Sequence, residues 1–182
     1  MERTTPKQLI SARINEFTMC IKMLLDAEHT LPALVILYVG IDTFGSLLRP
    51  ESEVDTKGDY FKQWVKDYMI GNAQVAFTAE DLWAARCGLL HTHTASSKLS
   101  REGKARQLNY FRAKGMPIPP VIQHAMRKAL AQGKLFVDVD ALSTAFTDGA
   151  QRFLAAVESD RALGKKVLHH STRLFGGWRY VV

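Results

Sequence analysis

The segment AARCGLLHTHT, residues 84–94, places an arginine, a thiol and two histidines within eight positions, Arg86 to His93. Arg86 can bind a phosphate through its forked guanidinium and stabilise negative charge that develops there. A neutral histidine such as His91 can remove the proton of a ribose 2′-hydroxyl, because its ordinary pKa lies close to physiological pH. These residue types fit cleavage of RNA by internal transesterification without a metal ion.

Helical geometry decides how these side chains are aimed. Successive residues of an α-helix are rotated by about 100°, so Arg86 and His91 diverge by about 140° around the helix axis. One helix therefore cannot readily aim both side chains at one atom. Two copies of the helix that meet across a dimer twofold can combine their side chains at one cleft. The sequence thus predicts that this chemistry requires a homodimer.

The two histidines are also candidates for a metal site. His91 and His93 diverge by about 200° on a helix, so they cannot bind one ion together if both are helical. The sequence has no HExxH motif and no other cluster of Cys and His with ligand spacing. We therefore expect no metal and no cofactor. The alternative for the whole segment is that Arg86 is a surface or ion-paired arginine and His91 a solvated or capping histidine.

An acidic residue, Asp42, lies inside the most apolar segment of the chain, residues 31–48. A buried carboxylate needs a charged or hydrogen-bonding partner. We expect Asp42 to pair with Arg86 and to fix the orientation of its guanidinium. The alternative is that Asp42 lies at a polar cavity or bonds to the hydroxyl of Thr43 or Ser46.

A basic run follows the motif, with Glu102 as its single acid. It consists of Lys98, Arg101, Lys104, Arg106, Arg112 and Lys114, with Tyr110 and Phe111 between them. Such a run can hold an RNA backbone, and an aromatic ring such as Tyr110 can stack on a base. The alternative is a solvated basic face. Residues 161–182 add five cations and no acid, and form either a second flank of this surface or a basic tail.

The elements that must position these residues are helical. Ile10, Ile14, Phe17, Ile21 and Leu24 form one apolar stripe, and Thr5, Pro6 and Gln8 resemble a helix cap. The segment 31–48 predicts a central buried helix. Further helices are indicated around residues 61–68, from Thr78 through the motif, over 121–133 and after Asp138 or Asp140, which can cap a helix. The run KLFVDV, 134–139, is ambiguous, and no set of strands supports a sheet. The predicted fold class is all-α, a bundle of five to seven helices.

Composition fits one domain. The chain has 182 residues, 47% of them hydrophobic and 23% charged, with a net charge of +6. We expect a single domain over residues 1–182, with its core at about 8–160 and a basic tail at 161–182. Two cysteines without CxxC spacing indicate a reducing compartment, so we expect a cytoplasmic protein without a secretion signal. The polar residues within 31–48 favour a core helix over a membrane span.

Three runs together resemble the HEPN superfamily (higher eukaryotes and prokaryotes nucleotide-binding). They are ALVILYVGIDTFGSLL, GDYFKQWVKDYM and TAEDLWAARCGLLHTHTASSKLSREGKARQLNYF. The resemblance covers about residues 8–160. It implies a small helical domain, usually dimeric, with an R-x4-to-6-H motif on a late core helix. It also implies an endoribonuclease of a toxin–antitoxin, phage-defence or RNA-processing system.

Carried over by position, the resemblance gives Arg86 and His91 as the motif residues, with His93 as the alternative histidine. His91 would be the general base, and the products would carry 2′,3′-cyclic phosphate and 5′-hydroxyl ends. Partners implied are RNA, a second copy, and an antitoxin or a nucleotidyltransferase. Active members commonly place Asn, Asp or His after the arginine, where this chain has Cys87. A thiol is a weak donor, so this departure favours the alternative of a non-catalytic scaffold. A DNA-associated regulator is a third reading, without a helix-turn-helix signature.

Overall fold

The computed structural model describes residues 5–70, 75–92, 94 and 96–175. These residues are mostly helical and carry one two-stranded sheet. The elements are α1 (Pro6–Asp26), α2 (Thr30–Ser46), α3 (Gly58–Trp64), the π-helical segment η1 (Val65–Ile70), α4 (Ala79–Thr92), α5 (Lys98–Arg101), β1 (Gln107–Phe111), α6 (Pro120–Leu130), β2 (Lys134–Asp138), α7 (Val139–Ser159) and α8 (Arg161–Phe175).

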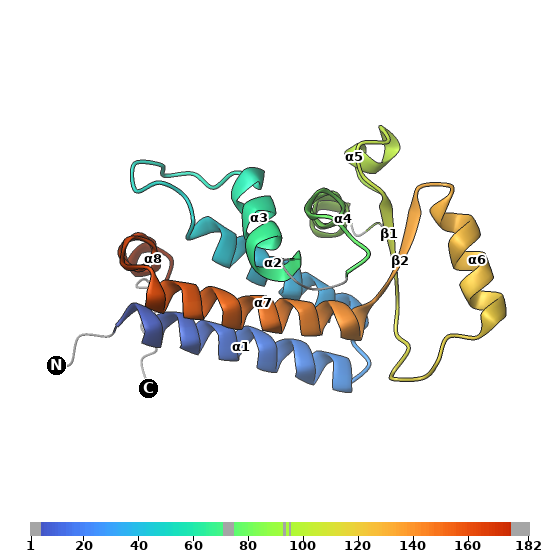
Figure 1. The fold of residues 1–182 in the computed structure, drawn as a ribbon, viewed down its shortest axis with the longest axis horizontal. Helices are drawn as coiled ribbons and strands as arrows, with labels where there is room; N and C mark the ends of the chain where they lie inside the picture. Colours follow the sequence, from blue (N-terminus) through green and yellow to red (C-terminus); the bar gives the residue numbers. More distant parts are fainter. Residues whose placement is uncertain (1–4, 71–74, 93, 95, 176–182) are drawn as a thin grey trace.

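Two long helices, α1 and α7, lie side by side along the long axis of the molecule (Figure 1). The predicted cap of α1 is confirmed. The amide of Gln8 donates to the Thr5 hydroxyl at 3.2 Å, and the amide of Thr5 donates to Gln8 Oε1 at 2.7 Å. At the start of α7, the Asp138 carboxylate accepts from the amide of Asp140 at 3.1 Å. Both caps satisfy first-turn amides that have no partner within the helix.

The central helix is α2, as its apolar sequence predicts. Leu37, Ile41 and Phe44 are buried, and the Phe44 ring lies 5.7 Å from Trp64 and 6.1 Å from Phe146. Phe44 therefore joins α2 to α3 and α7 in one aromatic core. Within the residues described, no helix combines the length and apolar character that a membrane crossing needs.

The helix predicted around residues 61–68 is present, and its second half is the π-helical segment η1. Its first half buries Phe61 and Trp64. The carbonyl of Tyr68 in η1 accepts a hydrogen bond from Arg152 Nε of α7 at 2.7 Å. A Cβ at Gly149 would lie 3.0 Å from the same carbonyl oxygen, so glycine permits this close approach. The segment is thus fixed against α7.

The motif helix α4 begins at the predicted cap. The amide of Thr78 donates to Asp81 Oδ2 at 2.9 Å, and the amide of Asp81 donates to the Thr78 hydroxyl at 3.2 Å. One face of α4 is buried and consists of Ala79, Leu82, Ala85 and Leu89. The other face is partly exposed and carries Trp83, Arg86, Cys87 and Leu90. The helix therefore presents the motif arginine at the surface of the protein.

The fold is mainly helical, as the sequence predicts, but the expectation that no strands form a sheet is wrong. β1 and β2 pair in parallel, with Leu108 opposite Leu135 and Tyr110 opposite Val137. These four side chains face the core, because alternate residues of a strand point to the same side of a sheet. The intervening helix α6 makes the unit β1–α6–β2. The ambiguous run 134–139 thus contains a strand, and part of the basic run contains the other.

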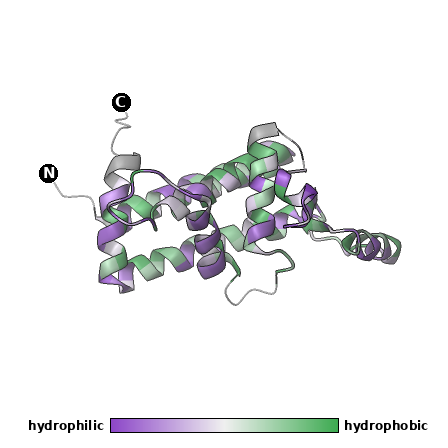
Figure 2. Cartoon of the chain, turned by 90° about the horizontal axis from the view of Figure 1, so that it is seen from above, coloured by the Kyte–Doolittle hydropathy of each residue, from purple (hydrophilic) through white to green (hydrophobic). Residues whose placement is uncertain are grey.

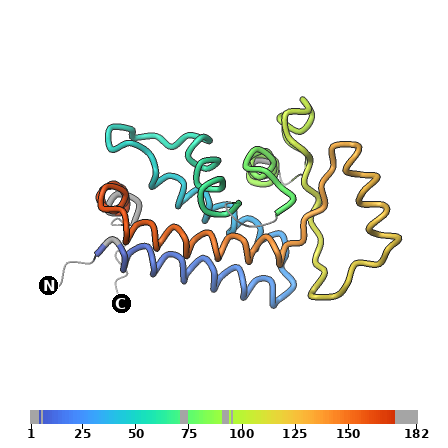
Figure 3. The backbone as a smooth tube through the Cα atoms, viewed as in Figure 1, coloured from blue at the N-terminus to red at the C-terminus, as the bar shows by residue number. Residues whose placement is uncertain are grey.

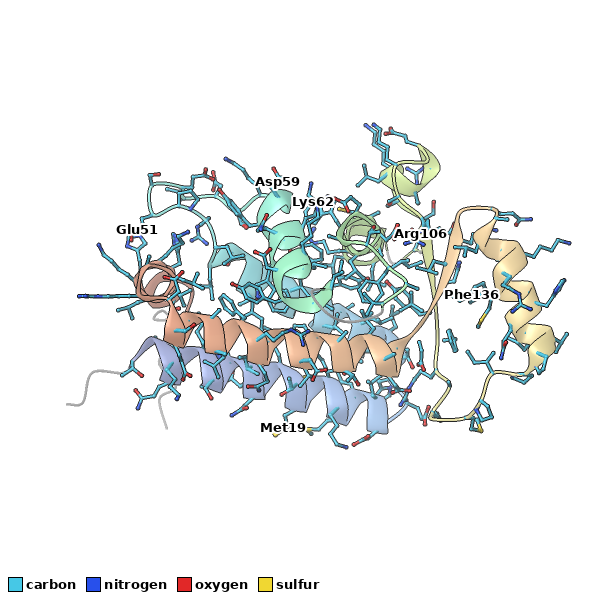
Figure 4. The ribbon with its side chains drawn as sticks, viewed as in Figure 1. Met19, Glu51, Asp59, Lys62, Arg106 and Phe136 are labelled. Atoms are coloured by element: carbon cyan, nitrogen blue, oxygen red, sulfur yellow. The ribbon has the colours of Figure 1, made fainter. Side chains whose placement is uncertain are left out.

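The helix α6 lies outside the main body, as Figure 2 shows. None of its residues is buried, and Val121 is 72% exposed. Figure 4 places Phe136 between β2 and α6, so this ring covers the outer face of the sheet.

At the other end of the molecule, α8 packs against α1 and α7 (Figure 3). Val167 and His170 of α8 are fully buried, and His170 Nε2 lies 3.0 Å from the carbonyl oxygen of Arg49. Burial lowers the pKa of His170. The core therefore extends beyond residue 160, into the first part of the predicted tail. Of the tail cations, Arg161, Lys165 and Lys166 lie on α8, at the opposite end from α5 (Figure 1).

Candidate active site

The ion pair between Arg86 and Asp42, which the sequence predicts, is present. Nε and Nη2 of Arg86 each lie 2.8 Å from Oδ2 of Asp42. The two side chains are 21% and 26% exposed, so the pair lies at the boundary between core and solvent. Two donors on one carboxylate oxygen fix the plane of the guanidinium more firmly than one contact would.

The alternative partners of Asp42 bond elsewhere. The Thr43 hydroxyl donates to the carbonyl of Val39 at 2.8 Å, and the Ser46 hydroxyl donates to the carbonyl of Thr43 at 2.7 Å. Both hydroxyls are therefore used by the main chain of α2. Because Ile41 and Phe44 anchor α2 in the core, the Asp42 carboxylate has a fixed place from which to orient Arg86.

A second contact supports the guanidinium of Arg86. Its Cζ lies 5.3 Å from the centroid of the Trp83 ring, one turn earlier on α4. The indole is itself fixed, because it packs 5.3 Å from the Phe61 ring and over Gly58, where a Cβ would lie 2.5 Å from it. Cation–π contacts of this kind favour a guanidinium that is partly removed from water. Arg86 is thus held between a carboxylate and an aromatic face.

The candidate general base belongs to the same helix. The backbone of His91 lies in the last turn of α4, five residues after Arg86, as the sequence predicts. Its side chain and the whole of His93 lie outside the described part of the chain. Among the described residues no group of three His, Cys, Asp or Glu is arranged to hold a metal ion.

Cys87 follows Arg86 on the partly exposed face of α4. Burial raises the pKa of its thiol, and the positive charge of Arg86 opposes this effect without reversing it. The thiol therefore stays protonated at neutral pH. Since the thiolate is the reactive form, a protonated thiol is a weak nucleophile.

After α4 the chain turns back onto the helix at Gly88. The amide of Thr94 donates to the carbonyl of Gly88 at 3.3 Å, and a Cβ at Gly88 would lie 2.7 Å from the carbonyl oxygen of Thr94. Ser96 also lies against this position. A glycine is required there because any side chain would collide with the returning backbone. This role of Gly88 was not predicted. The available signal in the sequence is a glycine shortly before the Thr- and Ser-rich residues 92–97.

Two arginines of the predicted RNA-binding run are bound to acids within the protein. Arg106 donates from Nε to Oδ2 of Asp81 at 3.0 Å and from its amide to Oδ1 at 2.7 Å, and Figure 4 shows it between α4 and β1. Arg112 bonds to Asp140 at 2.8 Å and to the carbonyl of Leu25 at 2.7 Å. These arginines hold the β1 strand to α4, α7 and the end of α1.

Tyr110, the aromatic side chain considered for base stacking, points into the protein. Its hydroxyl lies 2.5 Å from the hydroxyl of Tyr38 on α2. Burial raises the pKa of both phenols, so both stay neutral. Tyr110 joins β1 to the central helix, and its ring does not offer an open face to a base.

Three of the four remaining cations of the predicted run gather at α5, whereas the fourth, Lys114, follows β1 and pairs with Glu28 at 2.5 Å. Lys98, Arg101 and Lys104 are exposed, and Lys104 pairs with Glu102 at 2.8 Å. This surface, the α5 corner, consists of Lys98, Arg101 and Lys104 and follows directly on the motif helix.

Comparisons of the chain with protein-family models, with curated proteins and with solved structures find no match.

Proposed function

We propose that the protein is a HEPN-like, metal-independent endoribonuclease whose centre is formed by Arg86 and His91 of two copies. The observation that carries the proposal is the ion pair between Arg86 and Asp42, which fixes a phosphate-binding group at a partly exposed surface. Unlike Arg106 and Arg112, Arg86 lies on the helix that also carries His91, and stabilisation of a transition state depends on charge that is preorganised in this way.

In the proposed reaction His91 accepts the proton of the ribose 2′-hydroxyl. The 2′-oxygen then forms a bond to phosphorus while the bond from phosphorus to the 5′-oxygen breaks. The leaving 5′-oxygen takes up a proton from a second, protonated histidine or from water. Arg86 stabilises the charge on the pentacoordinate phosphorus. The products are a 2′,3′-cyclic phosphate and a 5′-hydroxyl.

The proposed dimer would bring α2 and α4 of two copies together near a twofold axis. An apolar stripe on α2 supports this arrangement, since Leu31 is 47% exposed, Val39 is 37% exposed and Val35 is partly exposed. The stripe leads along α2 to Asp42, so a second copy seated on it would lie beside Arg86. Leu31, Val35, Val39 and Asp42 are spaced by four, four and three residues, and residues at this spacing share one face of a helix. The same resemblance suggests an antitoxin or a nucleotidyltransferase as a further partner.

The second candidate function is a non-catalytic helical dimer that acts as a scaffold or binds a partner. Cys87 favours it, because a neutral, half-buried thiol takes the position where active members of the family carry a stronger polar group. In this case the ion pair of Arg86 would serve only to join α4 to α2.

Cleavage of RNA in the presence of EDTA separates the two candidates. The parent protein should cleave single-stranded RNA and leave cyclic phosphate ends, and Arg86→Ala and His91→Ala should each lower the rate by at least about a hundredfold. Matched controls are Arg127→Ala and His124→Ala on the exposed helix α6, which should keep the parent rate. A well-folded parent that cleaves no RNA would favour the scaffold.

A further inference from the structure

A cavity of about 500 Å³ opens beside the motif helix, on the side away from the core. Its walls come from three parts of the chain, namely α4, the residues that follow it, and α5. The lining residues are Cys87, Gly88, Thr94, Ser96, Ser97, Lys98 and Arg101. The cavity exists because Gly88 lets the chain return across α4, which sets Thr94 and Ser96 opposite α5.

The charge of this cavity is positive. Lys98 and Arg101 lie on the α5 wall, and no acidic side chain is among its described lining residues. Within the described part of the chain, no carboxylate lies within 4.0 Å of the Arg101 guanidinium, whose Nη1 is 3.4 Å from the Ser96 hydroxyl. Lys98 has Glu102 at the longer distance of 3.8 Å. Arg106 and Arg112, in contrast, bind buried or half-buried acids and contribute no open charge.

The polar groups that accompany these cations are those that bind a phosphate. The Thr94 hydroxyl donates to the carbonyl of Ser96 at 2.9 Å, whereas the Ser96 hydroxyl accepts from Arg101 and can donate its own proton to a phosphate oxygen. An arginine fork and a lysine beside hydroxyls form a common recognition set for phosphate. The floor is Cys87, whose raised pKa keeps it neutral, so it does not repel an anion.

We infer that this cavity is a phosphate site that binds a phosphodiester of single-stranded RNA next to the one that is cleaved. The RNA part of this inference rests on the proposed function, whereas the phosphate chemistry does not. Burial raises the pKa of the Cys87 thiol, and the Arg86 side chain lies close enough to lower it in part by its charge and by a hydrogen bond, so the cavity adjoins the guanidinium. A strand that passes from Arg86 to the α5 corner would thus place neighbouring phosphates at Arg86 and at Arg101. Lys98 and Arg101 are positioning residues in this account.

Protection of Cys87 from alkylation tests the inference without any need for cleavage. The reaction of Cys87 with N-ethylmaleimide is followed by peptide mass spectrometry, and the half-buried Cys20 on α1 serves as the control within the same chain. A single-stranded DNA oligonucleotide of mixed sequence, which has no 2′-hydroxyl to be cleaved, should slow alkylation of Cys87 at least threefold. Alkylation of Cys20 should not change. Inorganic phosphate should protect Cys87 only at much higher concentration.

A double variant assigns the protection to the cavity. Lys98→Gln with Arg101→Gln should abolish the protection of Cys87 and raise KM for RNA while kcat stays within twofold of the parent. Lys128→Gln with Arg127→Gln on α6 removes the same charge and should leave both unchanged. All four side chains are exposed, so each variant should keep the melting temperature of the parent.

The outcomes separate this inference from the proposed function. Protection that depends on Lys98 and Arg101, in a protein that cleaves no RNA, supports the phosphate site and contradicts the nuclease. Cleavage of RNA without protection of Cys87 overturns the phosphate site and leaves the nuclease standing. Protection by inorganic phosphate but not by the oligonucleotide would keep the phosphate chemistry and overturn the assignment to a nucleic-acid backbone.

Discussion

Asp42 interrupts an otherwise apolar helix, and its partner explains why it is tolerated there. A half-buried carboxylate without a partner would be costly, and the two donors of Arg86 offset that cost. The ion pair also restricts the rotation of the Arg86 side chain. Asp42 therefore contributes to stability and, in the proposed centre, to the orientation of the group that binds phosphate.

Asp42→Asn tests this double role at nearly constant side-chain size. Loss of the charged hydrogen bonds should lower the free energy of unfolding by about 1–3 kcal/mol, and cleavage should fall at least tenfold because Arg86 is no longer oriented. Denaturant unfolding and the RNA assay measure the two effects. Asp148→Asn, at an exposed position of α7, is the matched control. Parent-like values of both quantities would show that the ion pair has neither role.

The buried carboxylate of Asp81 has a structural role. It is 2% exposed and accepts bonds from Thr78 and Arg106, which join the start of α4 to β1. Burial alone would raise its pKa, but the Arg106 guanidinium and the main-chain donors outweigh burial, so the pKa is lowered. A carboxylate with a lowered pKa stabilises the fold above the pKa it has when unfolded, and this contribution is lost as the pH falls through the folded value.

Asp81→Asn should therefore destabilise the protein by about 3–5 kcal/mol at pH 7, because Arg106 loses its partner. The difference from the parent should begin to shrink as the pH falls below about 4, where Asp81 of the unfolded parent takes up a proton, and should disappear once the pH is below the lowered pKa of the folded protein. Urea unfolding at pH 7 and at pH 3 measures both values, with the exposed Asp55→Asn as control. A difference that is the same at the two pH values would argue against the linkage.

At the scale of elements, helices with local signals could be predicted and strands could not. Thr5, Thr78 and Asp138 cap the starts of α1, α4 and α7. Each cap bonds to an amide only two or three residues further along the chain, so it can be recognised from a short stretch of sequence. β1 and β2 are five residues each and gain their hydrogen bonds only from each other, across the intervening α6. Neither strand has enough residues to display a clear alternation by itself.

The return of the chain across α4 gives a test at this scale. Replacement of glycine by alanine inside a helix usually stabilises it by up to about 1 kcal/mol. Gly88→Ala should instead lower the melting temperature, because the new Cβ would lie 2.7 Å from the carbonyl oxygen of Thr94. It should also weaken oligonucleotide binding, since the displaced residues line the phosphate cavity. Calorimetry measures the change in melting temperature. A rise would contradict the close approach of the Thr94 carbonyl to position 88.

At the scale of the whole molecule, the candidate site was only partly predictable from sequence. Asp42 and Arg86 could be paired, although 44 residues separate them, because Asp42 is an acid inside an apolar helix and Arg86 is the motif arginine. The loss of Arg106 and Arg112 to internal acids could not be foreseen, since Asp81 and Asp140 do not interrupt an apolar segment and nothing in the sequence marks them as acids in need of a partner. Tyr110 likewise bonds to Tyr38, which is 72 residues away. Contacts between residues far apart in the sequence thus decide which cationic side chains remain available to bind a ligand.

The exposed stripe on α2 gives a prediction about assembly. Val39→Asp places a charge in the middle of the proposed interface, where it would be buried without a partner. The variant should sediment as a monomer and lose cleavage while its helical circular dichroism stays that of the parent. Val121→Asp on the exposed helix α6 is the matched control and should remain dimeric. A dimeric Val39→Asp protein would place the interface elsewhere.

The most direct test of a shared centre mixes two inactive proteins. Because Arg86 and His91 diverge by about 140° on one helix, each centre should take its arginine from one copy and its histidine from the other. Arg86→Ala and His91→Ala proteins should each be inactive, and subunit exchange between them should restore one intact centre per mixed dimer, or about a quarter of the parent activity in EDTA. A mixture as inactive as its components, beside an active parent, would contradict a centre shared between two copies.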